Sequence, residues 1–201
     1  DLVKTMQTLK KQRWCATHEY LLKKITYFRK GKRILFKSPD NTAKMGMLHD
    51  LYPDAKFVHI YRAPYKVLLS TIHMFEAGIQ AMTFEKVPPH ALIEDMAVQF
   101  YKRIYLQYLK DMARAPREQL VEIAYSDLTR APIDTLAQIY TALDLPGFEA
   151  ARPQMLAHIE SQRAYRTNRF ELPDALRRKI NRELGFFFDH YHIPMQTEKG
   201  D

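Results

Sequence analysis

Two cations and one aromatic residue stand at the ends of three short apolar runs in the sequence. Lys37 follows the run 33–36, Arg62 follows 56–61, and Tyr125 ends the run 120–125. If the runs are parallel strands, the three side chains meet at the sheet edge where ligands of such sheets bind. A guanidinium fork and an ammonium suit a phosphate, and a ring suits a flat base. The alternative is that each residue is an ordinary polar residue at the end of a strand, with no ligand to bind.

Arg62 also opens a turn into a predicted helix. Pro64 is at a plausible first helical position, and Ser70 lies eight residues after Arg62. Free backbone N–H groups at a helix start favour a nearby anion, and a serine hydroxyl could add a donor. An Arg and a Ser at this spacing often arise by chance, so the pair alone is a weak signal.

The elements that must position these residues alternate along the chain. We predict the three runs as strands, a less regular segment over 76–89, and one or two helices within 1–29. Further helices are expected over 40–52, 64–75, 90–114, 132–143, 149–161 and 173–191. Alternation of this kind predicts an α/β fold, a parallel sheet flanked by helices, with a helical C-terminal part.

The string from Lys37 to Ser70 resembles the sulfotransferase family that uses 3′-phosphoadenylyl sulfate, in its bacterial and Golgi-like branch. The family's second signature is a strand, then Arg-x-Pro, then a Ser eight residues after the Arg, which Arg62, Pro64 and Ser70 match. Tyr125-Ser-Asp-Leu128 is similar to the family's Tyr-Glu-Asp-Leu segment. The resemblance extends over about residues 30 to 193, and its tail includes Tyr165, Asn168-Arg169 and Tyr191-His-Ile193.

This resemblance implies a P-loop nucleotide-hydrolase-like core and one sulfotransferase-like domain over residues 1–201. The implied reaction moves a sulfuryl group from 3′-phosphoadenylyl sulfate to an acceptor hydroxyl or amine, without a metal. The implied acceptor is a small molecule, a lipid or a glycan.

The resemblance also implies a role for individual residues. Arg62 and Ser70 would hold the 3′-phosphate of the nucleotide, and Tyr125 would approach the adenine. Lys37 would stabilise charge near the transferring sulfuryl group. Further residues expected on the phosphate side are Arg166 and Arg169.

Two departures from the family pattern remain. Ala63 stands where the family has Asp or Asn, which removes a good helix N-cap. The family's first signature, a Gly-rich or Ser/Thr-rich loop that cradles the 5′-phosphosulfate, has no match in residues 1–32. Because the sequence begins with Asp, we expect an N-terminally incomplete chain. The alternative is a non-catalytic nucleotide-binding or interaction module.

Composition bounds the remaining possibilities. The 201 residues are 46% apolar and carry a net charge of +8, which is typical of a globular protein with an anionic partner. A nucleic-acid binder ranks last, since no nucleic-acid-binding signature accompanies the charge. Cys15 is the one cysteine, so we expect a reducing, cytoplasmic location. The sequence has no apolar run long enough to span a membrane, and the histidines lack metal-ligand spacing.

Overall fold

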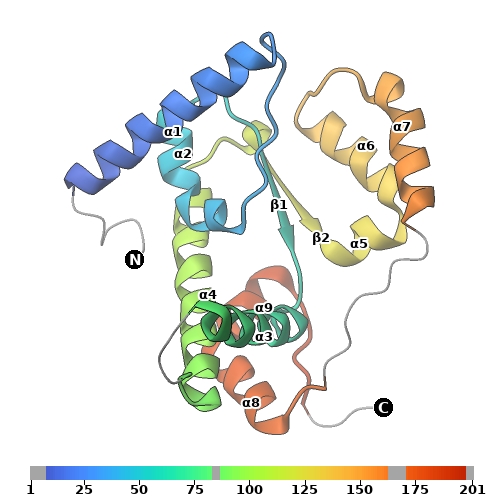
Figure 1. Cartoon of the computed structure of the whole chain (residues 1–201). Coiled ribbons are helices and arrows are strands. Elements are labelled where there is room, and N and C mark those ends of the chain that lie inside the picture. Colours follow the sequence, from blue (N-terminus) through green and yellow to red (C-terminus); the bar gives the residue numbers. More distant parts are fainter. Residues whose placement is uncertain (1–7, 83–86, 163–170, 198–201) are drawn as a thin grey trace. The chain divides into compact units, whose positions relative to one another are not determined.

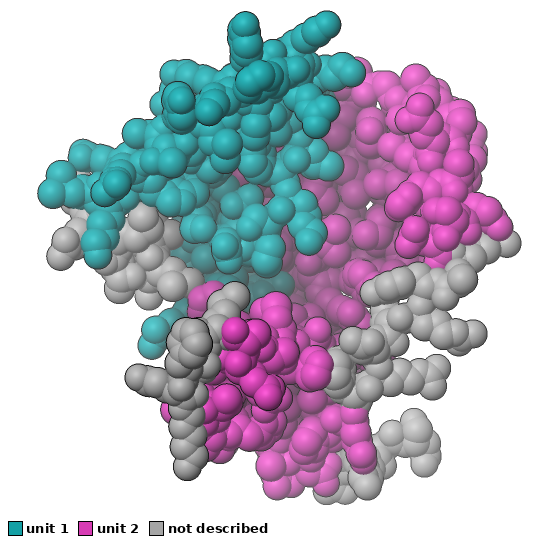
Figure 2. Space-filling view, in the orientation of Figure 1, with its two compact units in different colours: residues 1–55, 103–115 teal, residues 56–102, 116–201 magenta. Residues whose placement is uncertain are grey.

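The computed structural model describes residues 8–82, 87–162 and 171–197. The chain divides into two compact units (Figure 2). Unit 1 comprises residues 1–55 and 103–115, and unit 2 comprises residues 56–102 and 116–201. The expectation of a single domain over the whole chain stays a prediction.

Unit 1 begins with helix α1 (Thr8–Phe28), whose inner face carries Trp14, His18, Leu22 and Ile25 at helical spacing. The helix ends at a turn in which Gly31 has a φ of +74°, a conformation that glycine adopts without strain. A 3₁₀ helix (Pro39–Lys44) and α2 (Met45–Leu51) follow. The unit also contains residues 103–112 of α4 (His90–Met112).

The strand predicted over residues 33–36 is wrong. Residues 32–38 form neither helix nor strand, and the Leu35 side chain is 91% exposed. A strand is stabilised by hydrogen bonds to a neighbouring strand, and the sheet described here holds β1 and β2 alone. A four-residue apolar run therefore did not suffice to specify a strand.

Unit 1 is held together by a buried carboxylate. The Gly46 backbone N–H donates to Asp111 Oδ2 at 3.1 Å, and the Gln107 amide donates to Asp111 Oδ1 at 2.7 Å. Asp111 is 6% exposed. A Cβ at position 46 would lie 2.8 Å from the Asp111 carboxyl carbon, so only glycine allows α2 to approach α4 this closely.

The sheet lies in unit 2 (Figure 1) and consists of β1 (Phe57–Tyr61) and β2 (Leu120–Ala124). The two strands are parallel and in register from Phe57–Leu120 to Tyr61–Ala124. Both strands were predicted within one residue of their observed bounds. Helices and a parallel strand pair together confirm the α/β class.

Helices make up most of the rest of unit 2. They are α3 (Pro64–Met82), residues 90–102 of α4, a 3₁₀ turn (Arg117–Gln119), α5 (Tyr125–Arg130), α6 (Pro132–Ala142), α7 (Phe148–Ser161), α8 (Asp174–Glu183) and α9 (Gly185–Tyr191). Ile123 of β2 is buried with Ile139 and Leu143, which anchors α6 against the sheet. The aromatic core includes Tyr65 against Phe188, with ring centres 5.3 Å apart.

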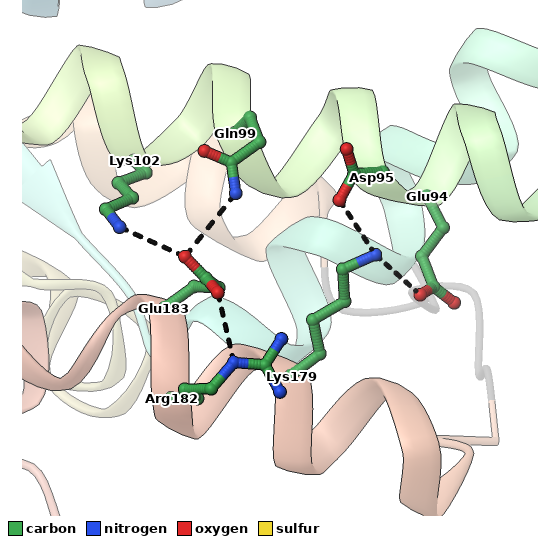
Figure 3. Close-up of polar contacts among 7 residues, drawn as sticks. All are labelled: Glu94, Asp95, Gln99, Lys102, Lys179, Arg182 and Glu183. Carbon is green, nitrogen blue, oxygen red and sulfur yellow. Dashed lines mark hydrogen bonds and ion pairs between the residues drawn. The ribbon is translucent and has the colours of Figure 1, made fainter.

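Polar contacts join α4 to α8 (Figure 3). Glu183 accepts hydrogen bonds from Lys102 at 3.0 Å and from Gln99 at 3.4 Å. One turn earlier on α8, Lys179 lies 3.2 Å from a Glu94 oxygen and 3.1 Å from an Asp95 oxygen. Asp95 is 54% exposed, whereas Lys179, Glu94 and Glu183 are partly shielded from water. The contacts tie α4 to α8.

Two predicted boundaries differ from the structure. The segment expected to be less regular is helical as far as Met82, because α3 continues past Phe75 and through Gly78. Residues 83–86 lie outside the described residues. The single helix predicted over 173–191 is two helices. Leu184, with a φ of −118° and a ψ of 21°, departs from helical geometry and separates them.

Candidate nucleotide site at the strand ends

The carboxyl ends of β1 and β2 bring Arg62 and Tyr125 together. Tyr61 is in register with Ala124, so the next residue of each strand emerges at the same level. The Arg62 guanidinium carbon lies 4.5 Å from the centre of the Tyr125 ring. A cation over an aromatic face is attracted by the ring quadrupole, and this contact orients the guanidinium plane.

Arg62 keeps its hydrogen-bonding capacity for a ligand. It is half-buried, and within residues 8–82, 87–162 and 171–197 no carboxylate forms an ion pair with it. A guanidinium over a ring, with no acidic partner among the described residues, can offer its donors to a planar or tetrahedral anion.

Helix α3 begins two residues after Arg62. Its first residue is Pro64, and its first turn presents backbone N–H groups without intrahelical acceptors. The positive end of a 19-residue helix favours an anion at the same place as the Arg62 side chain. The local sequence thus combines a side-chain cation with a helix N-terminus.

The first turn of α3 is itself fixed by a hydrogen-bonded clamp. The Tyr65 hydroxyl donates to Asn181 Oδ1 at 2.5 Å and accepts from the Gln196 backbone N–H at 2.9 Å. Asn181 Nδ2 donates to the Gln196 carbonyl at 2.9 Å, and buried Arg177 donates to the carbonyls of Gln196 and Thr197. Sequence reasoning missed this clamp, because its members carry no periodic or motif signal.

A pair of stacked aromatic rings lies beside Arg62 in the sequence. The Tyr61 and Tyr191 rings stack with centres 3.9 Å apart, and the Tyr191 hydroxyl donates to Glu122 Oε1 at 2.7 Å. Burial, with smaller contributions from Asp127 and Glu122, raises the pKa of Tyr61 above its ordinary value. The pair fixes the end of β1 against α9, directly before Arg62.

The remaining predicted site residues are placed separately. Ser70 is exposed on α3, six residues after Pro64 and therefore about 9 Å along the helix axis. Ser70 and Arg62, both in the described part of the chain, form no hydrogen bond with each other. Lys37 is exposed and belongs to unit 1, two residues before the 3₁₀ helix. Arg166 and Arg169 lie outside the described residues.

Comparisons with known proteins show which family the chain resembles. A family model described as the sulfotransferase family matches residues 5–150. The omega-hydroxy-beta-dihydromenaquinone-9 sulfotransferases Stf3 of Mycobacterium bovis and Mycobacterium tuberculosis are each 29% identical to this chain over 176 residues. That alignment covers 85% of this chain and 44% of each relative.

A solved structure shares the fold. The crystal structure of sulfotransferase STF9 from Mycobacterium avium matches with a TM-score of 0.63 and 20% identity. The match covers 84% of this chain and 44% of that structure, so the chain spans less than half the length of the relatives it matches. Because the family model covers well over half of its residues, the chain belongs to the sulfotransferase family.

Proposed function

We propose that this chain carries the nucleotide-binding part of a sulfotransferase that moves a sulfuryl group from 3′-phosphoadenylyl sulfate to an acceptor hydroxyl or amine. The observation that carries the proposal is the Arg62 guanidinium over the Tyr125 ring at the ends of two parallel strands. Membership of the sulfotransferase family supports the class of reaction. One domain over residues 1–201 is part of the same proposal.

The residues at the strand ends fit the donor nucleotide. Arg62 has no acidic partner among the described residues and can donate to a phosphate, and the start of α3 adds backbone N–H groups. Tyr125 offers an aromatic surface for the adenine, and the exposed Ser70 hydroxyl would donate to the 3′-phosphate. When bound, the donor supplies an activated sulfuryl group.

The other residues act on charge and position. Lys37 would stabilise the charge that grows on the bridging oxygen, where an ammonium lowers the barrier to transfer. On the phosphate side, Arg166 and Arg169 would add positive charge. Holding donor and acceptor in line supplies much of the rate in transfers of this kind, and the clamp on Tyr65 keeps the first turn of α3 in place for that purpose.

For the acceptor, we propose a hydroxyl on a lipid-like molecule, within the wider class of small-molecule, lipid and glycan acceptors. The support is the name of the two mycobacterial relatives, whose substrate is an omega-hydroxy dihydromenaquinone. At 29% identity the acceptor of this chain can differ from theirs while the reaction stays the same.

A second candidate is a module that binds the nucleotide without turnover. Residues 8–28 are helical throughout, so this stretch holds no loop that could cradle a 5′-phosphosulfate. The two candidates differ in one measurement. Sulfuryl transfer to an added alcohol acceptor requires the enzyme, whereas nucleotide binding without any transfer is expected of the module.

The experiment is a calorimetric titration with adenosine 3′,5′-bisphosphate. We expect Arg62→Ala to weaken binding about 10- to 100-fold, since a charged hydrogen bond is worth about 1.5–3 kcal/mol. Arg178→Ala on the exposed face of α8 is the control and should bind as the wild type does. Equal binding by Arg62→Ala and wild type, or no binding by the wild type, would contradict the proposal.

A further inference from the structure

Exposed apolar side chains gather on α1 and on the stretch that follows it, all within unit 1. Tyr27 is 81% exposed and Phe28 is 73% exposed, and Leu35 is more open still. Other exposed large apolar residues of the same stretch are Leu9, Tyr20, Leu21 and Phe36. Single exposed apolar residues are ordinary, but seven within 8–37 form a surface that suits a partner.

Helix α1 has two faces with different roles. Trp14 stacks on His18 with ring centres 4.7 Å apart, and the His18 ring lies 3.0 Å from the Tyr52 hydroxyl. This inner face is therefore occupied inside unit 1. Tyr20 and Tyr27 are seven residues apart on the opposite face and point into solvent, so the outer face is an open apolar stripe.

A dense positive charge surrounds this stripe. Residues 8–37 contain ten lysines and arginines and one acidic residue, Glu19. The basic residues are Lys10, Lys11, Arg13, Lys23, Lys24, Arg29, Lys30, Lys32, Arg33 and Lys37. Lys24 lies 5.2 Å from the centre of the Tyr20 ring, so charge and aromatic surface are interleaved. The cations of residues 8–37 are complementary to a flat anionic surface, and the apolar side chains are complementary to an apolar layer beneath it.

A groove of about 510 Å³ continues the same surface. Leu22, Thr26, Tyr27 and Tyr52 line it together with Glu19 and Lys23, and its walls are mostly apolar. It opens to solvent beside the exposed Tyr27 side chain. The groove is shallow and open, and its apolar walls extend the exposed apolar surface of α1.

We propose that residues 8–37, with this groove, bind the surface of an anionic phospholipid bilayer. The tyrosines and phenylalanines enter the boundary between headgroups and acyl chains, while the lysines and arginines meet the lipid phosphates. Among the described helices, none combines the length and the apolar character needed to cross a bilayer. The proposed contact is made by side chains exposed on α1 and on the stretch after it.

A second copy of the chain and a nucleic acid fit the surface of residues 8–37 less well than a bilayer does. Two copies of this surface facing each other would place ten cations against ten, which opposes association at physiological salt. A nucleic acid would neutralise the cations, but it offers no apolar interior for Leu35 or Phe28. A bilayer satisfies both the charge and the apolar surface.

The test is sedimentation with vesicles of phosphatidylcholine, with and without phosphatidylglycerol, at physiological salt. We expect binding to the anionic vesicles and weak binding to the neutral ones. Lys23→Glu/Lys24→Glu and Tyr27→Ser/Phe28→Ser should each lower the partition coefficient more than about 10-fold. All four side chains are exposed, and matched controls are Leu156→Ser on α7 and Arg178→Glu on α8, which should bind as the wild type does.

Three results would overturn the proposal. The first is no binding to anionic vesicles, or binding that the two double variants leave unchanged. The second is self-association that Tyr27→Ser/Phe28→Ser abolishes, which would assign the surface to a second copy. The third is a chain that does not bind vesicles but binds RNA or DNA, with that binding lost in Lys23→Glu/Lys24→Glu. Nucleotide titration of the same variants keeps this result separate from the proposed transfer activity.

Discussion

The Gln196 backbone N–H donates to the Tyr65 hydroxyl at 2.9 Å, across 131 positions of sequence. The same hydroxyl donates to Asn181 Oδ1, and Asn181 Nδ2 donates back to the Gln196 carbonyl. Tyr65 is the second residue of α3 and lies three residues after Arg62. The clamp therefore ties the start of the proposed phosphate site to the chain near residue 196.

Removal of this hydroxyl tests the clamp. Tyr65→Phe keeps the ring against Phe188 but leaves the Gln196 N–H and Asn181 without their partner. We expect the free energy of unfolding, measured with urea, to fall by about 1–3 kcal/mol. The control is Tyr20→Phe, whose ring is exposed on α1 and should change stability by less than about 0.5 kcal/mol. Equal effects of the two variants would exclude a role for the Tyr65 hydroxyl.

Two glycines give a matched pair of predictions with opposite sign. Gly46→Ala places a methyl group 2.8 Å from the Asp111 carboxyl carbon and should destabilise the protein by about 1–3 kcal/mol. Gly78→Ala adds a methyl group to open space inside α3 and should stabilise it by about 0.5–1 kcal/mol. Thermal unfolding of both variants checks this. A neutral Gly46→Ala would show that α2 and α4 do not approach as described.

Stability should depend on the protonation of His59. This residue of β1 is 8% exposed, and burial, with a smaller contribution from His190, lowers its pKa from 6.5 to about 4. Between these values the unfolded chain binds the extra proton, so stability falls as the pH drops from 6.5 towards 4. The loss amounts to about 3 kcal/mol at pH 4 and below. The acidic residue in register with His59 is Glu122 of β2, which accepts a hydrogen bond from the Tyr191 hydroxyl.

Denaturant unfolding at several pH values measures this dependence. His59→Phe should flatten the stability profile between pH 6.5 and 4, because no proton is then taken up on unfolding at this position. The control His158→Gln, on the exposed surface of α7, should keep the wild-type slope. A slope unchanged in His59→Phe would contradict the assignment.

The Glu183 carboxylate should make an acid-sensitive contribution. Hydrogen bonds from Lys102, Arg182 and Gln99 lower its pKa from 4.5 to about 2. The contribution to stability is therefore complete above pH 4.5 and is lost as the pH falls towards 2. Glu183→Gln should lower stability at neutral pH and remove this part of the acid slope. A variant as stable as wild type at pH 7 would mean that the contacts in Figure 3 are too exposed to matter.

Local patterns predicted much of this fold, and long-range contacts limited the rest. The runs that form β1 and β2 are bounded by turn residues and carry β-branched side chains, so they could be predicted as strands from the sequence. Residues 33–36 are also mostly apolar but form no strand, because strand pairing depends on a neighbouring strand that the local sequence does not identify. The extent of α3 was underestimated, since Gly78 weakens a helical pattern without ending the helix.

Some features of the site could likewise be predicted from the sequence, and others could not. That Arg62 and Tyr125 follow strands was readable, and their stacking follows from the register of β1 and β2. The clamp between Tyr65 and Gln196 was not readable, since hydrogen bonds across more than a hundred residues depend on the tertiary fold. The Tyr61–Tyr191 stack has the same origin. The roles of Lys37 and Ser70 remain predictions.

The most direct test of the central claim compares two ligands in two proteins. Adenosine 3′,5′-bisphosphate and adenosine 5′-phosphate differ by the 3′-phosphate that Arg62 is proposed to hold. Calorimetry should show that the wild type prefers the bisphosphate by about 10-fold or more, as expected for a charge-assisted hydrogen bond. In Arg62→Ala this preference should disappear while the weak affinity for adenosine 5′-phosphate stays the same. A preference that survives in Arg62→Ala would contradict the account.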